Sequence, residues 1–110
     1  MTEKRNAVSF LVDKVEHPGK AGAIHFVYGG AMGKPDEILG MRHACPCGCG
    51  CWGWLDFEAY GFKDFWEPQP KKGDDLAKLT ITPSIGFMKD RLTGIYHWHG
   101  YLRAGVFEEC

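Results

Sequence analysis

The chain has 110 residues, of which 45% are hydrophobic and 14% aromatic, and its formal net charge is −1. This composition indicates one globular domain spanning residues 1–110. The near-neutral net charge does not favour binding to nucleic acid, which needs an excess of positive charge. No apolar run approaches the ~20 residues of a membrane span, and the first one is broken at Asp13 and Lys14, which argues against a signal peptide. We therefore expect a cytoplasmic protein of a bacterium or of a phage-infected host.

Alternating apolar residues predict a series of short strands. In the first of them, Val8, Phe10 and Val12 share one face. Aromatic residues dominate the segment 52–60, where we expect a bulge near Gly53. The predicted strands comprise residues 7–15, 22–28, 37–42, 52–60, 79–82 and 95–102, with 106–107 as a short continuation.

The connections between these strands are rich in turn-forming residues. Residues 65–75 form a polar loop, residues 83–85 close a strand, and residues 87–94 turn the chain back. No stretch carries a 3.6-residue apolar stripe longer than two turns. The sequence therefore predicts a mostly β fold, a small antiparallel open barrel or sandwich.

Four of the five cysteines fall on alternate positions, separated by one proline and two glycines: Cys45, Cys47, Cys49 and Cys51. In an extended strand their thiols would form a row with spacings of about 6–7 Å. The interleaved glycines and proline allow the segment to curl into a knuckle that points several sulfurs inward. Zinc prefers tetrahedral nitrogen and sulfur ligands, so we expect a zinc site that staples the fold. There are two alternatives. The thiols can be reduced and pack as small hydrophobic groups, or two of them can form a disulfide within the cluster.

A second cluster near the C-terminus can complete such a site. His97 and His99 lie two positions apart and share one face of a strand, so either can supply a ligand or orient one. His25, on an earlier strand, is interpreted as a histidine outside the site. Cys110 is expected to be a free thiol at a frayed chain end. The candidate metal ligands are thus Cys45, Cys47, Cys49, His99, His97 and Cys51.

Three motifs in residues 40–106 resemble those of a small phage and bacterial family of unknown function. The chain reads Arg-His-Ala-Cys-Pro-Cys-Gly-Cys-Gly over residues 42–50, Thr-Pro-Ser-Ile over 82–85 and Trp-His-Gly-Tyr-Leu over 98–102. The family has an HxCPCGCG knuckle, a central PSI tripeptide and a C-terminal strand that reads roughly Cys-x-x-His. Some of its bacterial relatives lie beside ubiquitin-like conjugation genes and are suspected peptidases.

The resemblance implies particular metal ligands. Cys45, Cys47 and Cys49 match the knuckle of the family, and His99 matches its C-terminal histidine. Where the family pattern has a late cysteine, this chain has Tyr96. His97 or a further knuckle sulfur, Cys51, is therefore the substitute fourth ligand.

Sulfur-rich zinc sites are usually structural, and we expect that role here. A zinc ion held by two cysteines and one histidine, with a water in its open position, would instead serve catalysis. The zinc deaminases are excluded, because the chain lacks both the H-x-E motif and the later P-C-x-x-C motif.

The sequence leaves two main hypotheses of function open. The first is a non-enzymatic, zinc-stabilised β module that binds another protein, a phage-encoded accessory or host-interfering factor, because tryptophans of the kind enriched at interfaces are numerous. The alternative is a zinc-dependent or serine-type hydrolase or peptidase. In it, Ser84 is the nucleophile, His97 or His99 its base, and Asp90 or Asp56 the group that orients the base. A nucleic-acid knuckle would need clustered Lys and Arg, and only Arg42 lies near the cysteines.

Overall fold

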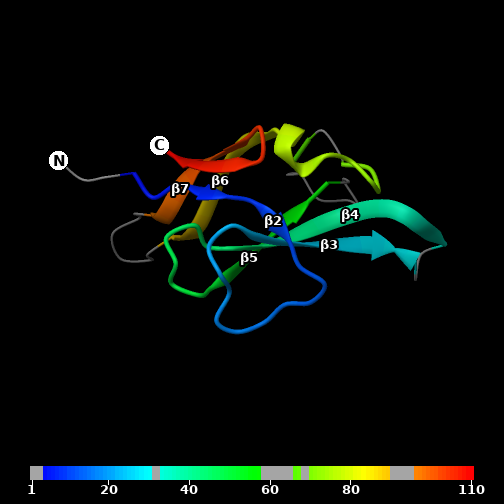
Figure 1. Ribbon diagram of the computed structural model, residues 1–110, viewed down its shortest axis with the longest axis horizontal. Coiled ribbons are helices and arrows are strands. Elements are labelled where there is room, and N and C mark those ends of the chain that lie inside the picture. Colours follow the sequence, from blue (N-terminus) through cyan, green and yellow to red (C-terminus); the bar gives the residue numbers. More distant parts are fainter. Residues whose placement is uncertain (1–3, 31–32, 58–65, 68–69, 90–95) are drawn as a thin grey trace.

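The computed structural model describes residues 4–30, 33–57, 66–67, 70–89 and 96–110, without the side chains of Pro83, Met88, Lys89 and Tyr96. It confirms the mostly β fold, with two four-stranded sheets that share one core (Figure 1). One sheet has the order β1 (Ala7–Val8), β8 (Val106–Glu109), β7 (Tyr96–Arg103) and β6 (Ile81–Lys89). The other has the order β2 (Phe10–Leu11), β3 (Ala23–Gly29), β4 (Lys34–Ala44) and β5 (Trp52–Asp56). Neighbouring strands are antiparallel, except that β2 runs parallel to β3. A 3-10 turn at Leu76–Lys78 precedes β6.

The core lies between the sheets and follows from strand alternation. On β6, Ile85 and Phe87 are buried, and on β7 so are Trp98 and Leu102. Since successive side chains point to opposite faces of a sheet, Ser84 and Gly86 on β6 share the other face with His97 and His99 on β7. The core cluster comprises Ile24, Ile38, Met41, Cys45, Leu55, Phe57, Leu79, Ile81, Ile85, Phe87, Trp98, Leu102 and Phe107.

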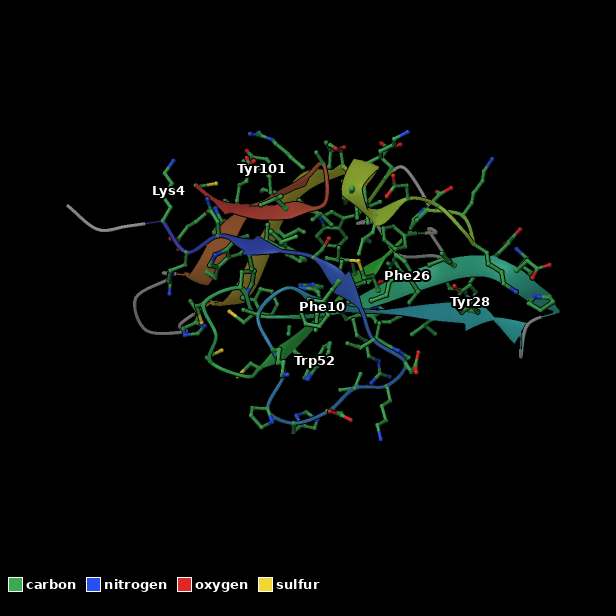
Figure 2. The ribbon with its side chains drawn as sticks, viewed as in Figure 1. Lys4, Phe10, Phe26, Tyr28, Trp52 and Tyr101 are labelled. Atoms are coloured by element: carbon green, nitrogen blue, oxygen red, sulfur yellow. The ribbon has the colours of Figure 1, made fainter. Side chains whose placement is uncertain are left out.

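The N-terminal segment differs from the single strand predicted over residues 7–15. It forms two short strands in different sheets, because residue 9 is where the chain crosses from one sheet to the other. The N–H and the hydroxyl of Ser9 both donate to the carbonyl of Gly105, at 2.8 and 2.6 Å. Val8 is 72% exposed and Phe10, labelled in Figure 2, is 38% exposed, so the predicted apolar face lies largely outside the core.

The other strands match their predicted positions more closely. β3 and β7 lie within one or two residues of their predicted ranges, whereas β4 is longer, because it pairs with β3 and β5 at once. The bulge expected near Gly53 is absent, since the register between β4 and β5 is regular. The shifts occur instead between Val27 and Gly29 of β3. β6 is the exception, because it extends from Ile81 to Lys89. Residues 83–85, expected to close a strand, and residues 87–89, expected to turn the chain back, therefore belong to β6, whose register against β7 is irregular between Ile81 and Ile85.

Residues 66–67 connect the edges of the two sheets. The N–H of Trp66 donates to the carbonyl of Asp56 on β5 at 2.8 Å. Glu67 exchanges two backbone hydrogen bonds with Thr82 on β6, at 2.8 and 2.9 Å. This part of the predicted polar loop is therefore paired with the sheets, whereas residues 58–65 and 90–95, with Asp90, lie outside the described residues.

The first described residues and the C-terminal strand β8 lie at the same end of the molecule (Figure 1). A salt bridge between Arg5 and Glu109 joins them. Among the residues that the structure describes, no helix has the length and apolarity needed to cross a membrane.

Candidate functional site

The cysteine knuckle is the turn of the β4–β5 hairpin. The N–H of Cys45 donates to the carbonyl of Cys51 at 2.8 Å, and the N–H of Gly48 donates to the carbonyl of Cys45 at 3.1 Å. Gly48 and Gly50 have φ of +87° and +90°, a region that favours glycine. The glycines therefore curl the segment, as predicted, and bring the sulfurs of Cys45, Cys47 and Cys49 together.

Four side chains converge on one point at this turn: Cys45, Cys47, Cys49 and His97, whose ligand atoms all lie within 4.8 Å of one another. The Nδ1 atom of His97 lies 3.5, 3.6 and 3.8 Å from the three sulfurs in that order. With zinc–sulfur bonds of about 2.3 Å and zinc–nitrogen bonds of about 2.0–2.1 Å, tetrahedral ligand atoms are about 3.5–3.8 Å apart. The nitrogen-to-sulfur spacings thus fit a tetrahedral metal ion, while the 3.2 Å between the sulfurs of Cys45 and Cys47 is shorter.

The thiols of this cluster differ in environment. Cys45 is buried, and burial raises its pKa. Burial also raises the pKa of Cys49, but the N–H of Cys51 and the neighbouring thiols outweigh it, so that the net shift is downward. All five cysteines are free of disulfides, so the disulfide alternative is not what the structure shows.

His43, the histidine of the knuckle motif, belongs to the core. Its ring lies edge-on to Phe87, with the centroids 4.5 Å apart, and 6.2 Å from that of Phe107. Burial lowers the pKa of His43 to about 3, and its Nδ1 has no hydrogen-bond partner. This histidine is therefore neutral and packs in the core beside the cysteine turn.

His99 contacts a different partner from His97, although both residues are on β7. Its Nε2 is 2.9 Å from the hydroxyl oxygen of Ser84 on the adjacent strand β6. Both side chains are half-buried, which leaves the pair accessible from outside. A hydroxyl within hydrogen-bond reach of an imidazole is the arrangement by which a serine is activated as a nucleophile.

The structure therefore divides the predicted site residues between two centres. His97, rather than His99, completes the cysteine cluster, and Cys51 is exposed and does not belong to the four. Cys110 is also an exposed thiol, but its N–H donates to the carbonyl of His99 at 2.9 Å, so the chain end is paired rather than frayed. Asp56 accepts a hydrogen bond from the indole of Trp54, on the sheet that does not contain His99.

Two supporting residues could not be recognised from the sequence. The indole N–H of Trp66 donates to the carbonyl of Ser84 at 3.2 Å and holds the backbone at the candidate nucleophile. The guanidinium of Arg5 donates to the carbonyl of His97 at 2.9 Å and to Glu109. Neither residue belongs to a motif, and only the tertiary structure brings them to the site.

Comparison with protein families identifies a relationship over most of the chain. A family model described as a bacterial ubiquitination-like system serine protease (BubE) matches residues 13–110. The chain belongs to the BubE family. The chain contains two serines, Ser9 and Ser84, and only Ser84 lies in the region matched by the BubE model.

The match to the BubE family agrees with the resemblance to proteins near ubiquitin-like conjugation genes. Ser9 is buried and hydrogen bonded to Gly105, whereas Ser84, the serine within the matched region, contacts a histidine. Comparisons with curated proteins and with solved structures found no match.

Proposed function

We propose that the chain is a serine hydrolase that cleaves a peptide or isopeptide bond of a ubiquitin-like protein or its conjugates, with Ser84 as nucleophile and His99 as general base. The observation that carries the proposal is the 2.9 Å contact between Ser84 Oγ and His99 Nε2. It joins a histidine to the single serine in the part of the chain matched by the family.

The reaction follows the chemistry of acyl transfer. Ser84 Oγ attacks the scissile carbonyl carbon while His99 Nε2 accepts the hydroxyl proton, and the carbonyl π electrons move to its oxygen. The tetrahedral intermediate collapses, the amine leaves with the proton from His99, and an ester to Ser84 remains. Water, deprotonated by His99, attacks this ester, and Ser84 regains the proton as the acid product leaves.

We further propose that Cys45, Cys47, Cys49 and His97 bind zinc in a structural role. Four protein ligands close the coordination sphere, so that the ion would supply stability rather than a reactive water. Since His97 and His99 are two residues apart on β7, a metal at the knuckle would also fix the strand that carries the general base. The protein partner expected from the sequence becomes, in this proposal, the substrate.

Cleavage of a fusion protein tests the proposed activity. The substrate is a bacterial ubiquitin-like protein with a reporter domain joined to its C-terminus by a peptide bond. We expect wild-type protein to release the reporter and Ser84→Ala to release none. Ser9→Ala is the matched control, because it removes the other serine hydroxyl of the chain, and it should retain cleavage. Equal release by wild-type and Ser84→Ala protein would contradict the assignment of Ser84 as nucleophile. No release by the wild-type protein would leave the non-enzymatic binding module as the better account.

A further inference from the structure

The outer edge of β6, on the side away from β7, lies beside the candidate nucleophile. β6 is the last strand of its sheet, and Ser84 is one of its residues. Along an antiparallel strand the backbone groups of alternate residues point toward the neighbouring strand and away from it. The N–H and carbonyl of Thr82 point away from β7, because they pair with Glu67. The carbonyl of Ser84 also points away from β7, where it accepts a hydrogen bond from the indole of Trp66.

Gly86 continues this alternation, and a second observation fixes its orientation independently. Gly86 is paired with His99, whose carbonyl accepts the N–H of Cys110 and therefore points to the β8 side. The Gly86–His99 pair is thus of the non-hydrogen-bonded type. The N–H and carbonyl of Gly86 consequently point to the outer edge, where Gly86 is exposed and where no strand of the described residues pairs with it.

Gly86 has no side chain to extend toward His99, the residue with which it is paired. In a non-hydrogen-bonded pair the two Cα atoms are about 4.5 Å apart and the side chains lie close together. Any larger residue at this position would place its Cβ beside the imidazole. Gly86 therefore offers a donor and an acceptor two residues from Ser84 and directly across from His99.

From this geometry we infer that the substrate binds as an extended peptide segment that adds to the edge of β6 and exchanges main-chain hydrogen bonds with Gly86. This inference rests on the proposed function and specifies how the substrate is recognised. Strand addition obtains affinity from main-chain hydrogen bonds and accepts varied side chains. The occupant is an extended segment or tail with a free backbone N–H at the paired position. Its end lies next to Ser84, where Trp66 and Glu67 occupy the edge.

Gly86→Pro is the sharpest test, because it removes the outward N–H and spares the hydrogen bonds to β7. Proline is tolerated on an edge strand when its nitrogen faces outward. Gly86→Ala is the matched control, because it places the same Cβ beside His99 but keeps the N–H. With a pool of proline-free fluorogenic decapeptides as substrate, we expect kcat/KM of Gly86→Pro to be about three- to tenfold below that of Gly86→Ala, the effect of one lost hydrogen bond. Labelling of Ser84 by a small fluorophosphonate, which does not need the edge, should be equal in the two variants.

The outcomes separate the two proposals. A Gly86→Pro protein that is labelled and cleaves peptides as well as Gly86→Ala would overturn strand addition. Wild-type protein that is not labelled at Ser84 would instead contradict the proposed function. A second measurement needs no catalysis: hydrogen exchange at the Gly86 amide of Ser84→Ala should slow at least tenfold when the same peptides bind. Unchanged exchange at saturating peptide would refute the inference whatever the activity.

Discussion

Replacing His97 and His99 one at a time separates the two centres of the site. In His97→Ala the cluster loses the nitrogen that lies 3.5–3.8 Å from the three sulfurs. A structural zinc site contributes about 10–16 kcal/mol in total, so one of four ligands accounts for about 2.5–4 kcal/mol. At 1.4 kcal/mol per factor of ten, the zinc affinity of His97→Ala should fall by about 10²–10³. His99→Ala, which removes a contact to Ser84 instead, should change zinc affinity less than about tenfold.

Competition with a chromophoric chelator measures both affinities on the same scale. His25→Ala is the matched control, since His25 lies on β3, where its Nδ1 contacts the carbonyl of Val12 at 3.2 Å. Cleavage activity should show the reverse order, with a complete loss in His99→Ala. A larger loss of zinc affinity in His99→Ala than in His97→Ala would refute the division of the two histidines between two centres.

Three further predictions concern the scaffold. Gly100→Ala should lower the free energy of unfolding in urea by about 1–3 kcal/mol or more, because its Cβ would lie 2.0 Å from the carbonyl oxygen of Glu108; Gly30→Ala, with nothing within 4 Å, should change it by less than about 0.5 kcal/mol. Arg5→Ala should cost less than about 1 kcal/mol at neutral pH. Hydrogen bonding to Arg5 lowers the pKa of Glu109 from its ordinary value of 4.5. The destabilisation caused by Arg5→Ala should therefore shrink as the pH falls below 4.5 and through the lowered pKa of Glu109. A destabilisation that grows in acid would contradict this prediction. A strong chelator should lower both the melting temperature and the labelling of Ser84 in wild-type protein, and a metal-free protein with unchanged melting would contradict the structural role.

Local patterns were sufficient to predict much of the scaffold. Strict alternation indicated β3 and β7, and the glycines between the cysteines indicated the curled turn, because both properties depend on neighbouring residues alone. The division of residues 7–11 between two sheets depends on the contact of Ser9 with Gly105, which is 96 positions away. No local pattern reports such a contact.

The roles of His97 and His99 show the same limit at the site. Their spacing correctly predicted a shared face of one strand, but a shared face does not tell which neighbour each side chain meets. That is decided by the register of β6 against β7, which places Gly86 opposite His99 and brings Ser84 within reach. The resemblance of the C-terminal motif therefore suggested His99 as a ligand, whereas the fold brings His97 to the cysteines.

The central claim is that Ser84 and His99 form a nucleophile and base separate from the cysteine cluster. Mass-spectrometric mapping of the fluorophosphonate adduct on the native protein tests it most directly. The account predicts a single adduct on the peptide that contains Ser84, lost in His99→Ala and retained in His25→Ala. An adduct at another residue, or undiminished labelling of Ser84 in His99→Ala, would contradict it.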